Sequence, residues 1–237
     1  SRGCPRCVLL LTVLSTRDYE VTIQPRSRFT ERFSAPACEP LEGRQLLATF
    51  TVDAADDLIN ADGTTSLREA IQMANAMPDN DVILFDASVT NIPLGSQLSI
   101  TSDMLIIGNG ASNLTIDGNN ATQIFDIDDG NGGNQALVTI TGMTLTNGIF
   151  DNAARGAAIY NVEDLVVDSV AFVNNGVANF TVDVNPMRAN DGGGIANLVG
   201  GILAVQNALF VGNRAFAGGG ISNDEASQAT VINSTFS

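Results

Sequence analysis

From residue 82 onward, apolar and polar residues alternate over short stretches, separated by turns rich in Gly, Asn and Asp. A period of two is typical of half-buried β-strands, and Gly-Asn and Asp-Gly pairs such as those in residues 117–120 mark turns. One earlier strand is expected at Phe50–Asp53. The later pattern predicts strands at Val82–Phe85, Gln97–Ile100, Met104–Ile107, Asn113–Ile116, Gln123–Ile127, Leu137–Ile140, Met143–Thr146, Leu165–Val167, Ala171–Val173, Ile202–Val205, Leu209–Val211 and Thr230–Ile232.

One segment, residues 66–77, has the spacing of an amphipathic helix instead. Its apolar residues recur at intervals of three and four: Leu67, Ala70, Ile71 and Ala74. Ser66 and Glu69 match the S-x-x-E capping box, and Pro78 ends the helix. Ser66, Arg68 and Glu69 have the residue types of a catalytic group, but we interpret them as helix-capping and ion-pairing residues.

The C-terminal part of the chain repeats itself. Three blocks share the pattern small-small-small-Ile-x-Asn: residues 156–161, 192–197 and 218–223. Each block is followed 13 or 15 residues after its Ile by Phe172, Phe210 or Phe236, and Leu145 occupies the matching earlier position. The intervals between these four positions are 27, 38 and 26 residues. Repeats of about 22–27 residues are typical of stacked coils, so the interval of 38 indicates an insertion, which we place at Phe180–Asn190.

Many short strands are also compatible with a β-sandwich, but the regular spacing and the in-phase recurrence of Ile, Phe and Asn favour a parallel β-helix. Coils that stack at a strand separation of about 4.8 Å bring equivalent side chains over one another. We therefore expect a column of phenylalanine rings and a ladder of asparagine amides. The glycines of each block are expected to adopt turn conformations that other residues reach only with strain.

Composition and charge narrow the function classes. The 237 residues are 44% hydrophobic but only 5% aromatic, without Trp, which suits a narrow core of small and β-branched residues. All 11 basic residues are Arg. Residues 1–47 hold seven Arg against five acidic residues, a net of +2, whereas residues 48–237 hold four Arg against 21 acidic residues, a net of −17. Such a surface excludes nucleic acids and anionic membranes as partners. It is typical of a secreted or cell-surface protein, or simply of a solvated face.

The N-terminal segment has the features of a leader. An apolar run at Val8–Leu14 follows Arg2 and Arg6, as in a signal sequence, and is too short to span a bilayer. Cys4 and Cys7 have the C-x-x-C spacing of a redox or zinc pair, for which Cys38 is the remaining thiol. We nevertheless interpret these cysteines as incidental in a removable leader.

Residues 24–40 are rich in Pro, Arg and Ser and are interpreted as a linker. The sequence Leu-Glu-Gly-Arg-Gln-Leu-Leu-Ala at 41–48 resembles the LEPR-xLL motif of large exported bacterial surface proteins, with Gly43 in place of the Pro of that family. The resemblance implies that residues 1–48 are a leader and sorting segment that export machinery recognises. The alternative is a short amphipathic helical turn.

The helical segment and its surroundings carry a second resemblance. Residues 62–71, Asp-Gly-Thr-Thr-Ser-Leu-Arg-Glu-Ala-Ile, followed by Asn75 and Val82–Phe85, resemble the CSLREA domain. Thr65 stands where that family has Cys, so a covalent role for the thiol is absent. The family's domain heads extracellular parallel β-helix proteins. The resemblance implies that residues 49–86 form an N-terminal cap whose helix covers the first coil.

The alternation of Gly blocks and Phe-x-x-Asn over residues 137–237 resembles the repeats of polymorphic outer-membrane proteins. This resemblance implies that residues 87–237 form a right-handed parallel β-helix in a secreted or cell-surface protein, with outer-membrane association as one form. It implies display or adhesion rather than catalysis. Residues 231–236 restart a coil without a following Gly block, so we expect a truncated solenoid, the front part of a longer surface protein.

Asp126, Asp128 and Asp129, in a stretch rich in Asp, Asn and Gly, are the densest carboxylate group and the candidate ligands for calcium. The order does not match an EF-hand, and a solvated turn is the preferred interpretation of this stretch. The chain has no His and no Lys for acid–base chemistry, and its late basic residues are Arg155, Arg188 and Arg214.

These features favour a non-enzymatic surface protein that displays or adheres, or that binds carbohydrate. We assign no catalytic residue and no cofactor. The competing hypothesis is a polysaccharide lyase or glycoside hydrolase of the pectin-lyase-like β-helix type, which requires carboxylates that converge in a lateral groove.

Overall fold

The computed structural model describes residues 47–77, 80–132, 135–149, 155–176, 191–198 and 200–237. The chain divides into two units, 1–43 and 44–237, and the described residues belong to the second. Several features taken from the sequence lie outside the described residues. They are the three cysteines, the apolar run at 8–14, the linker at 24–40, most of the motif at 41–48, the insertion at 180–190 and Arg188. The interpretations of these segments stay predictions.

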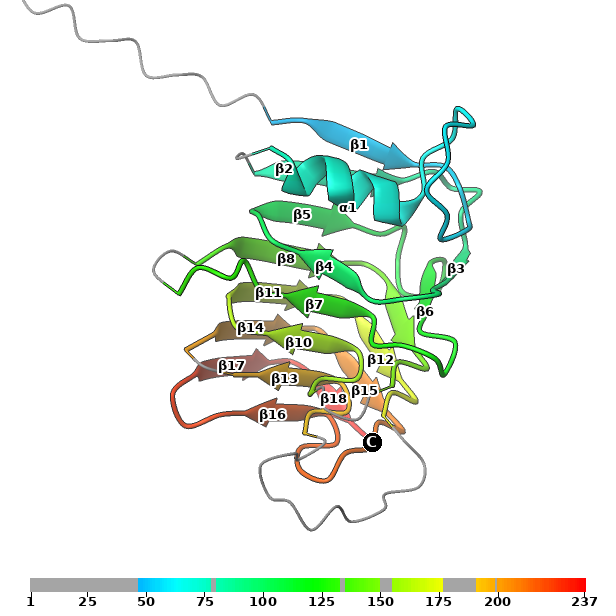
Figure 1. Cartoon of the computed structure of the whole chain (residues 1–237). Coiled ribbons are helices and arrows are strands. Elements are labelled where there is room, and N and C mark those ends of the chain that lie inside the picture. Colours follow the sequence, from blue (N-terminus) through cyan, green and yellow to red (C-terminus); the bar gives the residue numbers. More distant parts are fainter. Residues whose placement is uncertain (1–46, 78–79, 133–134, 150–154, 177–190, 199) are drawn as a thin grey trace, which may run out of the picture. The chain divides into compact units, whose positions relative to one another are not determined.

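The strands form three sheets in which every pairing is parallel (Figure 1). Sheet A contains β1 Thr49–Val52, β2 Asp81–Phe85, β5 Met104–Ile107, β8 Leu137–Thr141, β11 Asp164–Asp168, β14 Ile202–Gln206 and β17 Gln228–Ile232. Sheet B contains β3 Asn91–Pro93, β6 Thr115–Asp117, β9 Thr144–Thr146, β12 Ala171–Val173, β15 Leu209–Val211 and β18 Thr235–Phe236. Sheet C contains β4 Leu98–Ile100, β7 Phe125–Ile127, β10 Ile159–Asn161, β13 Ile195–Asn197 and β16 Ile221–Asn223.

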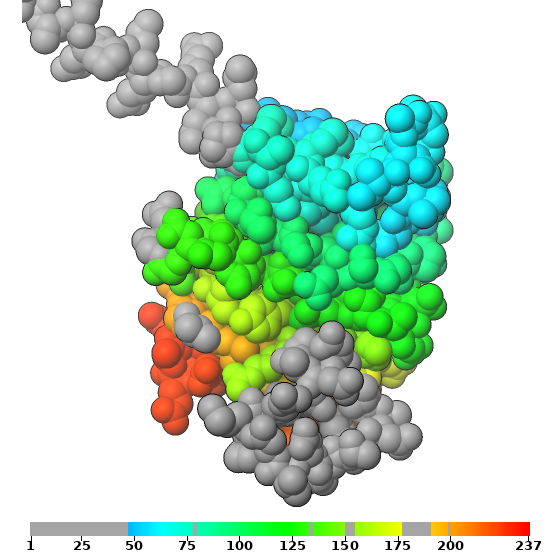
Figure 2. All heavy atoms as spheres, viewed as in Figure 1, coloured from blue at the N-terminus to red at the C-terminus, as the bar shows by residue number. Residues whose placement is uncertain are grey.

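From β2 onward the chain enters sheets A, B and C in turn, and each passage through the three is called a coil below. Each coil lies next to the one before it in sequence, so the colours of Figure 2 form successive bands. The all-β prediction is confirmed. The parallel ladders are compatible with a parallel β-helix, whereas a β-sandwich pairs its strands in antiparallel fashion.

The register stacks equivalent side chains, as the repeat predicts. Leu145, Phe172, Phe210 and Phe236 pair in successive strands of sheet B, and Ile159, Ile195 and Ile221 pair in sheet C. Phe172 and Phe210 are fully buried in the core. The rings of Phe210 and Phe236 also stack, with centroids 4.5 Å apart. The predicted phenylalanine column is confirmed.

The amide ladders are confirmed as well. In sheet C the Asn161 amide donates to Asn197 Oδ1 (2.7 Å), and the Asn197 amide donates to Asn223 Oδ1 (2.8 Å). On the sheet B side, the Asn175 amide donates to Asn213 Oδ1 (3.0 Å). Because these amides also bond to backbone carbonyl groups at the corners, they satisfy polar groups that the corners bury.

The helix α1, Leu67–Asn75, forms where its periodicity predicts. Both capping-box bonds are present: Glu69 N–H donates to Ser66 Oγ (3.2 Å), and Ser66 N–H donates to Glu69 Oε2 (2.8 Å). Arg68 pairs with Asp57 (2.7 Å) and donates to the carbonyl of Gln97. The buried face of α1 contacts β1, β2 and β4. Ser66, Arg68 and Glu69 therefore have structural roles in holding this helix in place. Among the described residues, no helix is long and apolar enough to cross a membrane.

Several strands escaped the alternation pattern. The Ile-x-Asn part of each Gly block forms β10, β13 or β16, and β3 at Asn91–Pro93 was not expected. Each has only three residues, so a period of two is hardly visible. The first glycines of the blocks do adopt turn conformations, with φ of 74°, 73° and 63° at Gly156, Gly192 and Gly218. Strand β6 begins at Thr115 rather than 113, because Asn113 N–H and Leu114 N–H bond to the Gly110 carbonyl in a turn.

Candidate functional site

The outward face of sheet C brings together polar side chains from separate coils. On β7, Phe125 and Ile127 are buried in the core, so Asp126 between them points outward. In register with Asp126 are Ser99 on β4 and Tyr160 on β10. Neighbouring parallel strands lie about 4.8 Å apart, so the Tyr160 ring and the Asp126 carboxylate are direct neighbours on this face.

Asp126 is held in a partly desolvated setting. The side-chain amide of Gln97 donates to Asp126 Oδ2 (2.9 Å). Burial raises the pKa of Asp126, and the nearby negative charge of Asp128 raises it further. Asp128 is exposed, and its Oδ1 accepts the N–H of Gly130 (2.8 Å). The two carboxylates therefore differ in environment.

Tyr160 is the aromatic side chain of this face. It is half-buried, and burial raises the pKa of its phenol, with smaller contributions from the charges of Asp128 and Asp126. Arg155 acts in the opposite direction. The Arg155 guanidinium lies 3.9 Å from the Asp224 carboxylate, which follows β16 two coils further on. Arg214 lies at a different corner, after β15, where its N–H bonds to the Asn175 carbonyl.

A cleft of about 350 Å³ opens beside Tyr160. It lies between β10 and the loop that follows β7. Its lining residues are Asp128, Gly130, Asn131, Gly132, Gln135, Tyr160, Val162 and Glu163. The Gln135 amide donates to the Gly200 carbonyl (3.1 Å), which links this loop to the coil that contains β14. The cleft thus offers one aromatic face, carboxylates and amides within one small volume.

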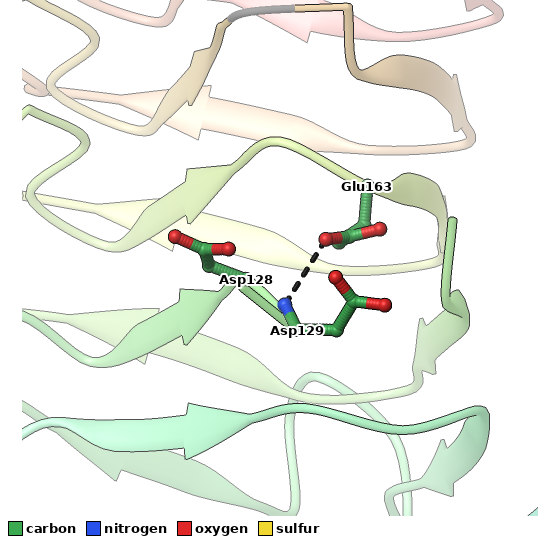
Figure 3. A group of neighbouring side chains, drawn as sticks. All are labelled: Asp128, Asp129 and Glu163. Atoms are coloured by element: carbon green, nitrogen blue, oxygen red, sulfur yellow. Dashed lines mark hydrogen bonds between the residues drawn. The ribbon is translucent and has the colours of Figure 1, made fainter. Parts of the chain in front are cut away.

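Glu163, in the turn before β11, holds the loop in place (Figure 3). Its Oε1 accepts the N–H of Asp129 (3.0 Å), and its Oε2 accepts the N–H of Ala136 (2.8 Å). The side chain is buried, and that burial raises the pKa of Glu163; the two backbone hydrogen bonds oppose this shift, and the charge of Asp129 adds to it. One carboxylate thereby fixes both ends of the loop.

Oxygen atoms of Asp128, Asp129 and Glu163 lie within 4.8 Å of one another (Figure 3). These hard oxygen donors are of the type that calcium prefers. Of the three candidates taken from the sequence, Asp128 and Asp129 belong to this group, whereas Asp126 faces Tyr160. Both Glu163 oxygens accept backbone hydrogen bonds, which orient the carboxylate, and calcium binding by this group stays a prediction.

Sequence reasoning missed Glu163 and Tyr160 as partners of these aspartates. Asp129 and Glu163 are 34 residues apart, and Asp126 and Tyr160 are also 34 apart. A common offset of one coil is the signal that would have found both pairs. Comparison of the chain with protein-family models, with curated proteins and with solved structures gives no significant match.

Proposed function

We propose that this chain belongs to an exported cell-surface protein whose right-handed parallel β-helix binds polysaccharide on the outward face of sheet C. The cyclic order of three parallel sheets supports the β-helix. The apolar run at 8–14 and the LEPR-xLL-like segment at 41–48 support export, and the CSLREA-like helix supports an extracellular β-helix. The Phe and Asn ladders support the likeness to polymorphic outer-membrane repeats.

The observation that carries the binding proposal is the half-buried Tyr160 in a cleft beside Asp126 and Asp128. An aromatic ring stacks on the apolar face of a sugar, while carboxylates and amides bond to its hydroxyl groups. The cleft has a volume of about 350 Å³, and the outward face of sheet C continues from it through Asp126 to the exposed Ser99 on β4. A long polymer is therefore a better ligand than an isolated sugar.

The charge of the chain limits which polysaccharides bind. Residues 48–237 carry a net charge of −17, and two aspartates flank the cleft. Uronate-rich polymers are repelled by such a surface. We therefore propose neutral or amine-bearing glycans as ligands, in preference to pectin or alginate.

The test is binding of the chain to immobilised neutral, amine-bearing and acidic polysaccharides, measured by affinity electrophoresis. We expect Tyr160→Ala to abolish binding and Tyr160→Phe to retain it, because the ring supplies the stacking surface. Val166→Ala, on the outward face of sheet A, is the matched control and should bind like the wild type. Absence of binding to every polymer, or equal binding by Tyr160→Ala, would refute the proposal.

A second candidate function, cleavage of the polysaccharide, is favoured by the difference between Asp126 and Asp128. A carboxyl group whose pKa is raised by burial, with a second, exposed carboxylate near it, is an arrangement that glycoside hydrolases use for acid and base chemistry. Release of reducing ends from the bound polymer distinguishes the two functions. Cleavage requires that Asp126→Asn lose turnover and keep binding, whereas a binding protein releases no product.

A further inference from the structure

Asparagine followed by glycine is a reactive pair in a polypeptide, because the glycine backbone nitrogen can attack the side-chain amide of the asparagine. Glycine has no side chain to shield this nitrogen, and it reaches the backbone conformations that ring closure requires. The reaction also needs a backbone N–H that is not engaged elsewhere and a side-chain amide that is free to turn. The chain contains four such pairs, at 109–110, 131–132, 147–148 and 175–176.

In three of the four pairs the glycine nitrogen is engaged. Gly110 N–H donates to the Gly142 carbonyl (2.7 Å). Gly148 N–H donates to Asn175 Oδ1 (2.8 Å), and Gly176 N–H donates to the Gly148 carbonyl (2.8 Å). Attack by any of these nitrogens first requires that a backbone hydrogen bond open.

The asparagine amides of the same three pairs are held as well. The Asn109 amide donates to the Asp86 carbonyl (3.1 Å), and the Asn147 amide donates to Asp117 Oδ1 (2.9 Å). The amide of Asn175 donates to the Leu145 carbonyl and to Asn213 Oδ1. Both reacting groups are therefore fixed at these three positions.

The pair Asn131–Gly132, in the loop after β7, differs in each respect. Both residues are exposed, and a Cβ at Gly132 would meet no atom within 4 Å. Among the described residues, nothing accepts the Gly132 N–H or the Asn131 side-chain amide. The backbone N–H of Asn131 donates to Asp129 Oδ1 (2.6 Å), which leaves the Asn131 side chain itself free. Asn131 and Gly132 both line the cleft beside Tyr160.

We propose that Asn131 is a site of spontaneous covalent modification, at which the chain converts its own side-chain amide to a carboxylate. The Gly132 nitrogen forms a bond to Asn131 Cγ, the Cγ–Nδ2 bond breaks, and the Gly132 N–H proton leaves with Nδ2 as ammonia. Water then opens the resulting succinimide ring at one of its two carbonyl carbons. The products are aspartate and isoaspartate, and water is the only reactant added.

The modification changes the cleft in two ways. Either product adds one negative charge to a lining that already contains Asp128 and Glu163. Isoaspartate also carries the backbone through the former side chain, which lengthens the loop that Glu163 holds at Asp129 and Ala136. On the premise of the proposed polysaccharide binding, the added carboxylate should favour amine-bearing glycans over neutral ones.

The test is incubation of the full chain at mildly alkaline pH in water enriched in heavy oxygen, followed by mass spectrometry of its peptides. Ring opening incorporates oxygen from the labelled water, so each converted asparagine is marked. We expect conversion at Asn131 to be at least about tenfold faster than at Asn109, Asn147 and Asn175, because those sites must first break hydrogen bonds. In urea all four pairs should react at similar rates, since the dipeptide is the same.

Gly132→Ala is the variant that isolates the attacking nitrogen. The space around Gly132 accepts the added methyl group, but that group crowds the nitrogen, so conversion at Asn131 should slow by at least about tenfold. Conversion at Asn131 that is no faster than at Asn147 in the folded chain would overturn the proposal. Unchanged conversion in Gly132→Ala would overturn it as well. Both results are obtained from peptide masses, so they do not depend on polysaccharide binding.

Asn131→Asp reproduces the aspartate product and tests its effect on the cleft. It should bind an amine-bearing polysaccharide about twofold to fivefold more tightly than the wild type and a neutral one no more tightly. Unchanged affinity for the amine-bearing polymer would overturn the expected effect on binding. Absence of binding by both chains would instead refute the proposed function, while the labelling result would still decide whether Asn131 is modified.

Discussion

Phe172 on β12 and Phe210 on β15 stack in neighbouring coils, with ring centroids 4.5 Å apart and planes 1° from parallel. The distance follows from the strand separation of a parallel sheet, since the two residues are register partners. Both rings are buried, so the column fills the core beneath sheet B with its largest side chains. The stability of this part of the stack depends on that column.

Phe210→Ala is expected to lower the free energy of unfolding by about 3–5 kcal/mol, because it removes a buried ring from between two others. Phe210→Leu should cost only about 1 kcal/mol, since Leu145 occupies the equivalent position one coil before Phe172. Urea unfolding followed by circular dichroism measures both. Equal losses for the two variants would show that ring stacking, rather than filled volume, dominates.

The buried amide ladder makes a second prediction. Asn197 accepts from Asn161 and donates to Asn223 and to the carbonyl groups of Gly201 and Gln228. Asn197→Asp replaces the donor with a buried carboxylate that faces these oxygens, and should cost at least about 3 kcal/mol. The loss should shrink at acidic pH, where the introduced carboxyl is protonated.

The control for this variant is Asn233→Asp. The Asn233 amide also donates to an asparagine in the neighbouring coil, Asn207 Oδ1 (2.6 Å), but this bond is exposed. Water solvates the new carboxylate there, so the change should stay within about 1 kcal/mol. Similar losses at positions 197 and 233 would contradict the role assigned to burial.

We expect position 194 to accept only glycine, because the neighbouring atoms leave no room for a side chain. A Cβ there would lie 2.5 Å from the Gly220 carbonyl oxygen and 3.0 Å from the Phe210 ring. Gly194→Ala must therefore push neighbouring backbones apart, and should cost at least about 2 kcal/mol. Gly132→Ala is the matched control, because a Cβ at Gly132 meets no atom within 4 Å. Thermal unfolding compares the two, and equal melting temperatures would contradict the close approach.

Glu163 predicts a pH dependence of stability. Burial raises the pKa of Glu163 above its ordinary value of 4.5, so the folded state favours the protonated form. The stabilisation from this group is complete below pH 4.5 and is lost as the pH rises through the raised pKa. The unfolding free energy of the wild type minus that of Glu163→Gln should therefore decrease as the pH rises through the raised pKa of Glu163. A difference that increases with pH would mean that the bonds from Asp129 N–H and Ala136 N–H outweigh burial.

Much of the fold was predictable because its information is periodic. Apolar alternation located most strands of sheets A and B, and the S-x-x-E pattern located α1. The recurrence of Phe and Asn predicted which residues stack. The strands β10, β13 and β16 were missed because three residues after a run of small residues carry almost no alternation.

The candidate site was only partly predictable. Asp126, Asp128 and Asp129 stand out as a cluster in the sequence, but nothing local indicates that Asp126 faces Tyr160 while Asp129 meets Glu163. Successive side chains along a strand point inward and outward in turn, so the neighbouring residues 126 and 127 lie in different environments. Glu163 looks like an ordinary surface carboxylate until the loop that it holds is placed beside it.

The amino-acid sequence sets the coil length, the inward residues and the columns of like side chains, since all three follow from the spacing of repeated residues along one chain. Tertiary structure alone decides which residues of different columns meet, as in the Tyr160 cleft and at the clamp formed by Glu163. The physical reason is that corner loops differ in length from coil to coil. The lateral partner of a residue is therefore fixed by how the coils stack, rather than by distance along the chain.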